Sequence, residues 1–268
     1  MKKLFALTLI LSLSFAACSK SETATGEVAE KGRVAINLGF DTQVEATRSE
    51  LAYESDCTRP AAEDFTLLIE GLSFEYDPEY SYRVEFESIT ELEDLYFYRG
   101  LYRASVSYGD VAVEGYDKPA FVGVEESFEV EARKNVTVEI TATIANALVL
   151  VEVTENFQKY FAGGHSFNVV TAAGNTFENV TAGDKAGEPI FIAPASFTVV
   201  GTATKQPNQS GANAVVVNMT DTFENVAPRT LYRVKMDVDT AGEATLKVTL
   251  NDQLVEERNI EQELNPWA

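Results

Sequence analysis

Alternation of apolar and polar residues is the feature of this chain that most limits its fold. The clearest run is NVTVEITATI, in which an apolar side chain falls on every second residue from position 136 to position 144. Successive side chains of a β-strand point to opposite faces of a sheet, so this period collects the apolar side chains on one face. They are Val136, Val138, Ile140, Ala142 and Ile144. The run therefore predicts a strand with one face against a core.

The same period returns along the chain, in GRVAINLGF, YSYRVEFE, LYRASVSYGD and LYRVKMDV. After the last of these, a turn containing Gly242 leads into a second alternating run over residues 244–250, which predicts a hairpin of two half-buried strands. Helical patterns are short, and only ITELEDLYFY and TENFQKYFAGG could each form a short helix or turn. Many short strands separated by turns predict an all-β protein built of sandwiches.

The length of 268 residues leaves room for two domains with separate cores. We expect an N-terminal β-sandwich over residues 31–145 and a C-terminal β-sandwich over residues 146–268. Each would have about seven strands in a transthyretin-like or immunoglobulin-like arrangement. The boundary falls at Asn146, between VTVEITATIA and ALVLVEVTE, because asparagine tolerates the left-handed conformation that a kink between domains needs.

The first residues have the pattern of an export signal. Two lysines precede an apolar run over residues 4–13, which is shorter than the roughly 20 residues that span a membrane. Small residues and Cys18 follow, and this order resembles the lipobox of bacterial lipoproteins, in which the cysteine becomes the lipidated N-terminus. The pattern predicts a lipoprotein signal peptide over residues 1–17, lipid attachment at Cys18 and a flexible polar tether over residues 18–30. An ordinary secretory signal, cut after SFA, is the alternative.

Charge and cysteine content limit the kinds of partner that the chain can bind. The chain carries 42 Asp and Glu against 21 Lys and Arg, and this acidic excess repels the phosphates of nucleic acid, so we expect no nucleic-acid partner. The expected contact with a membrane is through the N-terminal lipid. Cys57 is the only other cysteine, and a lipidated Cys18 leaves it without a disulfide partner, so we interpret Cys57 as a structural or incidental thiol.

Three adjacent segments carry a resemblance to a known family. They are YRGLYRASVSYGD, KPAFVGVEESFEV and NVTVEITATIANALVLVEV. Together they resemble an uncharacterised, fimbrillin-like family of lipoproteins from Gram-negative gut anaerobes. The resemblance implies a two-domain β protein that is lipid-anchored in the outer membrane, displayed on the cell surface or on the periplasmic face, and active in cell adhesion or pilus assembly.

The resemblance also implies a candidate processing site. In related pilus subunits an arginine near the N-terminus is cut, and a strand of a neighbouring fimbrillin-like subunit fills the groove that opens, by β-strand addition. Arg48, in EATRSE, stands in a comparable place in this sequence. Arg33 and Arg59 are rival positions, and a solvated charge in a loop is the other interpretation of Arg48.

Catalytic patterns are missing from the sequence. The single histidine, His165, lies beside Ser166, but that serine lacks the Gly-x-Ser-x-Gly surroundings of a nucleophile elbow. One histidine cannot build a His-rich metal site. We therefore expect no enzyme, no metal and no cofactor.

A tyrosine-rich stretch gives the alternative function. FEYDPEYSYRVEF and LYFYRG hold the candidate glycan-contact residues Tyr80, Tyr82, Tyr96 and Tyr98. Exposed aromatic rings stack on sugars, and neighbouring carboxylates accept hydrogen bonds from sugar hydroxyls. This would make the protein a monomeric surface glycan-binding lipoprotein for nutrient capture. The competing interpretation is that tyrosine is common in strands and that half of these rings lie in the core.

Overall fold

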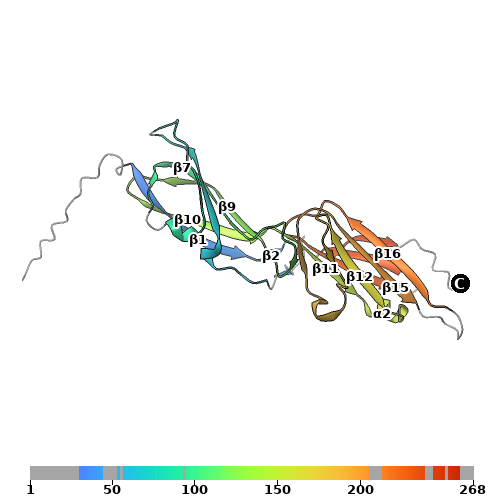
Figure 1. Cartoon of the computed structure of the whole chain (residues 1–268). Helices are drawn as coiled ribbons and strands as arrows, with labels where there is room; N and C mark the ends of the chain where they lie inside the picture. Colours follow the sequence, from blue (N-terminus) through green and yellow to red (C-terminus); the bar gives the residue numbers. More distant parts are fainter. Residues whose placement is uncertain are drawn as a thin grey trace, which may run out of the picture.

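The computed structural model describes residues 30–44, 53–54, 57–75, 77–92, 95–205, 213–238, 244–250 and 253–259. Within these ranges the regular secondary structure is almost entirely β-strand, which confirms the all-β class; the exceptions are one short α-helix and three short 3₁₀ helices, η1 (Ala62–Asp64), η2 (Ile89–Leu92) in ITELEDLYFY, and η3 (Gly183–Lys185). Figure 1 shows an elongated molecule in which two groups of strands follow one another along the long axis. The earlier strands, up to β10, form most of one group, and the strands from β11 onward form the other.

The first group contains β1 (Lys31–Asp41), β2 (Gln43–Val44), β3 (Tyr53–Glu54), β4 (Thr66–Ser73), β5 (Arg83–Phe86), β6 (Phe97–Tyr98), β7 (Gly100–Tyr108), β8 (Gly115–Tyr116), β9 (Phe121–Val130) and β10 (Asn135–Ile144). The second contains β11 (Ala147–Val153), β12 (His165–Thr171), β13 (Thr176–Phe177), β14 (Ile190–Ile192), β15 (Phe197–Lys205), β16 (Val215–Phe223), β17 (Leu231–Val238), β18 (Ala244–Leu250) and β19 (Gln253–Asn259), with the helix α2 (Glu155–Tyr160).

The first core lies inside a single seven-stranded sheet, in the order β5-β4-β7-β9-β10-β1-β6. β9 and β10 share only two residue pairs, Thr143 with Val122 and Ile144 with Phe121, so the sheet opens there into two layers. The alternation of LYRASVSYGD and NVTVEITATI is confirmed, because buried and less buried residues alternate along β7 and β10. Tyr102 of β7 and Ile140 of β10 thereby enter the same core.

The second core lies between a six-stranded sheet, in the order β19-β18-β17-β11-β14-β8, and a four-stranded sheet, in the order β13-β12-β15-β16. Val149 of β11, Phe167 of β12 and Val234 of β17 are completely buried in it. The predicted hairpin near the end of the chain is confirmed, since β17 and β18 pair in antiparallel register from Arg233–Thr249 to Val238–Ala244.

The helix α2 is the short helix that TENFQKYFAGG suggested. The hydroxyl of Thr154 caps its N-terminus by accepting a hydrogen bond of 3.2 Å from the backbone N–H of Phe157. Phe157 is completely buried against the second core. A helix as short as α2 is not stable alone, so this packing stabilises it.

Asn146 connects the two groups through hydrogen bonds. The residue is completely buried, and its Oδ1 accepts a hydrogen bond of 2.6 Å from the backbone N–H of Ala120. Its backbone carbonyl accepts another, of 2.7 Å, from the N–H of Arg229. Asn146 does not have a positive φ, so the expected left-handed kink is wrong. Its side-chain oxygen instead satisfies a buried backbone donor, while its Nδ2 finds no hydrogen-bond partner among the described residues.

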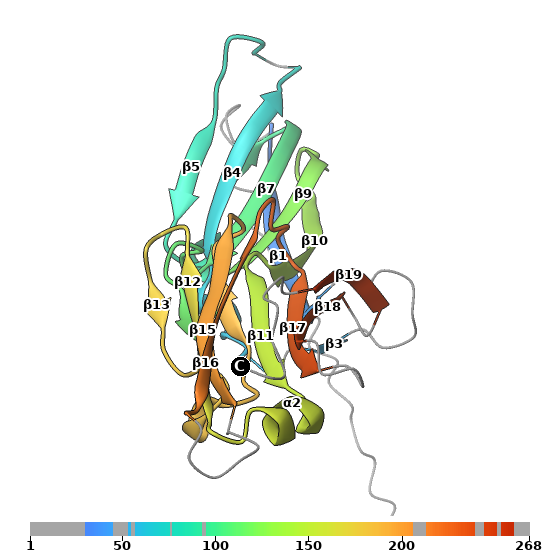
Figure 2. The same ribbon diagram turned by 90° about the vertical axis from the view of Figure 1, so that its right-hand side faces the viewer.

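A loop of the first group reaches into the second group's sheet. β8 pairs with β14, so a strand that precedes β9 completes the edge of the six-stranded sheet. Figure 2 shows β11 and β17 side by side in this sheet, with α2 after the end of β11. Next to β8, the Glu114 carboxylate accepts hydrogen bonds from the Thr171 hydroxyl, from the Asn175 amide at 2.8 Å and from the Ala193 backbone N–H at 3.0 Å. These bonds tie the two groups of strands together at their junction.

Candidate functional site

Three of the four candidate tyrosines lie in one aromatic cluster on the first core. The cluster consists of Phe74, Tyr80, Tyr82, Phe97, Tyr98 and Tyr102. The ring of Tyr80 meets that of Phe74 edge to face at 4.7 Å between centroids and that of Tyr98 at 5.3 Å. This geometry is favourable for aromatic pairs, and it engages these rings with one another.

Tyr102 is the centre of the aromatic cluster. Its side chain is completely buried, and its hydroxyl donates a hydrogen bond of 2.8 Å to the backbone carbonyl of Tyr98. Burial raises the pKa of the Tyr102 phenol, because the ionised form would lose its hydration. Burial also raises the pKa of Tyr80 and Tyr82. Tyr102 therefore belongs to the core, and Tyr80, Tyr82 and Tyr98 lie at its margin, partly buried.

Tyr96 stands apart from the aromatic cluster and is 50% exposed. The guanidinium of Arg33 lies 4.7 Å from the centroid of its ring and donates a hydrogen bond of 2.9 Å to its hydroxyl. The structure thus does not gather the four candidate tyrosines on one open surface. Tyr96 is the candidate whose ring is most available to solvent, and Arg33 covers part of it.

We expect the Tyr82→Ala and Tyr96→Ala variants to differ in stability. Truncating Tyr82 removes a ring that packs on Phe97 and Tyr102, which should lower the free energy of unfolding by about 2–3 kcal/mol. Truncating the exposed Tyr96 should lower the free energy of unfolding by less than about 1 kcal/mol. Urea denaturation followed by circular dichroism measures both values. Equal losses would show that the aromatic cluster does not act as core.

The first strand, β1, forms the second candidate site. It pairs with β10 in parallel through nine residue pairs, from Arg33–Asn135 to Asp41–Thr143. On its other side β1 pairs with β6 only at Lys31 and Gly32. Four apolar pairs lie side by side in this register: Val34 with Val136, Ile36 with Val138, Leu38 with Ile140 and Phe40 with Ala142. β1 is therefore an N-terminal strand that covers part of the first core and is held mainly by one neighbour.

The candidate processing site at Arg48 and the lipid site at Cys18 lie outside the described residues, as do the signal peptide and most of the tether. Arg48 falls between β2 and β3 in the sequence. The rival arginines are described. Arg33 lies within the β1 ladder, and Arg59 donates a hydrogen bond of 3.3 Å to the hydroxyl of Thr42. At Arg33 the backbone is already hydrogen-bonded in the ladder, so a protease cannot bind it as an extended substrate while β1 stays paired.

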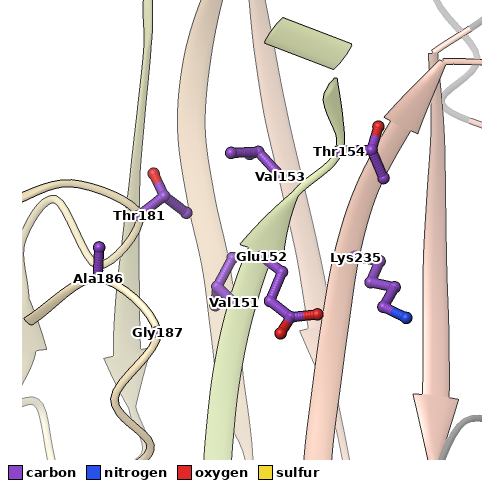
Figure 3. Close-up of a pocket in the computed structure, with 8 residues that line it drawn as sticks. All are labelled: Val151, Glu152, Val153, Thr154, Thr181, Ala186, Gly187 and Lys235. Atoms are coloured by element: carbon purple, nitrogen blue, oxygen red, sulfur yellow. The ribbon is translucent and has the colours of Figure 1, made fainter. Parts of the chain in front are cut away.

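A hollow of about 480 Å³ opens beside the end of β11, and sequence analysis gave no indication of it. Its walls are Val151, Glu152, Val153, Thr154, Thr181, Ala186, Gly187 and Lys235. Figure 3 shows β11 between the loop that carries Thr181, Ala186 and Gly187 on one side and Lys235 of β17 on the other. The hydroxyl oxygen of Thr181 is buried, and no hydrogen-bond partner for it is found among the described residues. The volume falls within the range of about 300–1,000 Å³ that ligand pockets span.

Other candidate chemistry is limited in the described part of the chain. Cys57 is half-buried and packs against the first core. His165 lies at the start of β12 beside the rings of Phe157 and Phe167, and burial lowers its pKa. No group of three or more His, Cys, Asp or Glu side chains in the described ranges could hold a metal ion. Likewise, no helix among the residues described is long and apolar enough to cross a membrane.

Comparison with family models gives one match. The model described as "Domain of unknown function (DUF4493)" matches residues 29–266. This match confirms the prediction, made from three adjacent segments, that the chain falls in an uncharacterised family. No curated protein matches the chain.

Several solved structures with some likeness come from Parabacteroides and Bacteroides species. A fimbrial assembly protein from Parabacteroides distasonis is 10% identical, with a TM-score of 0.43, and the match covers 74% of this chain and 91% of that protein. A protein provisionally described as a cell adhesion protein from the same species is 10% identical with a TM-score of 0.44, over 82% and 97%. A provisionally described polysaccharide-binding protein from Bacteroides thetaiotaomicron is 10% identical with a TM-score of 0.41, over 86% and 99%. Such low similarity carries no conclusion about the role of this chain.

Proposed function

We propose a role in cell adhesion or pilus assembly for this chain, which belongs to the DUF4493 family. In this proposal it is a lipid-anchored protein of the outer membrane, held by Cys18 and the tether that follows, and it has no enzymatic activity. Residues 31–145 and 146–268 form two β-sandwich domains in series. The hydrogen bonds of Asn146 and Glu114 across the junction favour a stiff unit, which suits a protein that holds a binding surface away from the membrane.

The observation that carries the proposal is the placement of β1. This strand is the first described element of the chain, and the sequence returns to the first sheet only at β4. Its long ladder is with β10, which lies far away in the sequence. A cut after Arg48 would leave β1, together with the lipid on Cys18, attached to the rest of the protein by non-covalent contacts alone, so the lipid would hold the subunit only until β1 is exchanged. β1 could then leave, and the side of β10 that it covers would become a groove.

A strand that refills this groove must reproduce the backbone pairing and the apolar side chains that β1 provides. Main-chain groups of β10 need a partner over nine residue pairs, and the apolar positions alternate in step with Val136, Val138 and Ile140. A donor strand therefore needs four apolar residues at alternate positions, in the parallel or antiparallel direction. Main-chain hydrogen bonds would supply affinity, and the alternating side chains would supply specificity. A second fimbrillin-like subunit is the donor in this proposal.

An immunoblot of the native outer-membrane fraction tests the proposal, with samples run before and after heating in detergent. Strand-exchanged subunits should resist detergent until they are heated. We expect the natural chain to give a ladder that collapses to one band on heating, and Arg48→Ala to give one band in both lanes.

Arg59→Ala is the matched control, because it removes an arginine that lies on the same connection before β4. It should keep the ladder. A single band from the unheated natural chain would remove strand exchange from the proposal. A ladder that persists in Arg48→Ala would remove Arg48 as the processing site.

A further inference from the structure

We propose that the open edge of β11 binds an extended peptide segment of a partner protein, which adds to the six-stranded sheet as a short antiparallel strand. This site lies beside the second core, on strands that the proposed exchange of β1 does not touch. It is therefore independent of processing at Arg48.

The ladder on this side of β11 is incomplete. β14 pairs with β11 only at Ala147–Ile192, Leu148–Phe191 and Val149–Ile190. On the opposite side β17 continues to pair with β11 through Val153. Residues 150–153 therefore form a strand edge with a neighbour on one side only, among the residues that the structure describes.

The backbone groups that point to the open side can be identified. The N–H of Leu148 donates to the carbonyl of Thr230 at 2.9 Å, and the N–H of Thr154 donates to the carbonyl of Met236 at 3.0 Å. Both bonds go towards β17. Because successive residues of a strand direct their N–H and C=O groups to opposite sides, the intervening odd-numbered residues face away from β17. Val151 and Val153 thus present their main-chain donors and acceptors to the hollow that they line.

Residues 183–188 precede β14 and would extend its pairing with β11, but they turn away and hydrogen-bond to one another. The N–H of Ala186 donates to the carbonyl of Gly183 at 3.2 Å, and that of Glu188 donates to the carbonyl of Lys185 at 3.1 Å. Gly183 and Gly187 have φ values of 75° and 84°, which glycine adopts without strain. These turns leave the hollow between the loop and β11 (Figure 3).

The chemistry of the hollow fits a peptide better than a flat aromatic ligand. Peptide N–H and C=O groups match the alternating acceptors and donors of Val151 and Val153. Thr181 adds a buried hydroxyl that lacks a partner in the described structure, and such a group is costly unless a ligand or water satisfies it. Directly opposed residues of paired strands share a face, so the peptide residues opposite Val151 and Val153 should be apolar. The residue between them would lie beside Glu152 and Lys235, where a polar side chain is expected.

A phage-displayed library of random heptapeptides, panned on the full chain, is the probe. We expect enriched peptides with an apolar-polar-apolar core, and at least tenfold weaker binding of these peptides to Val153→Pro. Proline at this position deletes an N–H that faces the hollow and leaves the bonds to β17 in place. Val153→Ala is the matched control and should bind within about twofold of the natural chain.

A second variant keeps the test decisive if Val153→Pro fails to fold. Ala186→Trp fills the hollow from its exposed loop side without changing β11, and it should also weaken binding at least tenfold. Arg48→Ala should bind the peptides as the natural chain does. Failure to enrich any peptide, or equal binding by the natural chain and Ala186→Trp, would overturn the proposal.

Discussion

Replacing Tyr102 by alanine should lower the free energy of unfolding by about 3–5 kcal/mol, the largest effect that we expect from a single side chain in this protein. Its ring contacts Phe74, Tyr82, Phe97 and Phe128 at centroid distances between 5.3 and 5.9 Å. The side chain is completely buried, so its loss leaves a cavity as well as a transfer cost. Urea denaturation followed by circular dichroism measures the change, provided that the variant folds.

Tyr102→Phe separates the hydroxyl from the ring. It keeps the packing and removes the hydrogen bond to Tyr98, so it should cost about 1 kcal/mol. A loss as large as that of Tyr102→Ala would mean that the hydroxyl, and not ring packing, dominates the contribution of Tyr102.

The same variant gives a pH test with a defined sign. Burial raises the pKa of Tyr102 in the folded protein above its ordinary value of about 10. The stability that depends on the neutral phenol is therefore fully present below about pH 10 and is lost as the pH rises from there through the higher folded pKa. Between about pH 10 and pH 12 the free energy of unfolding should fall more steeply for the natural chain than for Tyr102→Phe. Parallel curves would contradict the assignment of a buried, neutral phenol.

Glu114→Ala should lower the free energy of unfolding by about 2–4 kcal/mol, because one carboxylate accepts three hydrogen bonds from the other group of strands. The loss leaves the Thr171 hydroxyl, the Asn175 amide and the Ala193 N–H without their acceptor. Amide hydrogen exchange at Gly115 and Tyr116 of β8 should also become faster, since β8 is held to β14 by only two residue pairs.

Two other variants serve as controls for Glu114→Ala. Glu114→Gln keeps an acceptor oxygen and should lose about half as much stability. Glu126→Ala removes a carboxylate that is 76% exposed and paired with Arg103, and it should change the stability by less than about 1 kcal/mol. An effect of Glu126→Ala equal to that of Glu114→Ala would show that net charge, and not the bonds across the junction, is responsible.

Local patterns in the sequence predicted the strands of the alternating runs and a short helix or turn at α2, but gave no prediction of β12, β15 or β16. The period of two in NVTVEITATI and LYRVKMDV predicts a strand with one buried face. This pattern lies within a single strand, so it can be seen without knowing the partner strand. In α2 the hydroxyl of Thr154 caps the helix N-terminus, a local contact within the predicted stretch TENFQKYFAGG. Arg48 and Cys18 stay predictions, because both lie outside the described residues.

Contacts between distant segments could not be predicted in the same way. Nothing in the sequence of β1 states that its partner is β10 or that the two are parallel, since many strands share the same alternation. The tyrosines illustrate the same limit. Residue type places aromatic side chains near one another in the sequence, but only the fold decides that Tyr82 packs in the aromatic cluster while Tyr96 remains exposed. The open edge of β11 depends on where β14 begins, and the glycines and the proline of TAGDKAGEP before it indicate only a loop.

The distance along the chain between β1 and β10 has a consequence for the order of folding. Val34 and its neighbour in the sheet, Val136, are separated by about a hundred residues, so their pairing closes a long loop. β1 is made first and finds its main partner late, because a parallel pairing over so long a loop is slow to form. For that interval its alternating apolar side chains have no sheet to join. We expect β1 to pair among the last strands of the first core, and until then its apolar side chains are open to pairing with other strands.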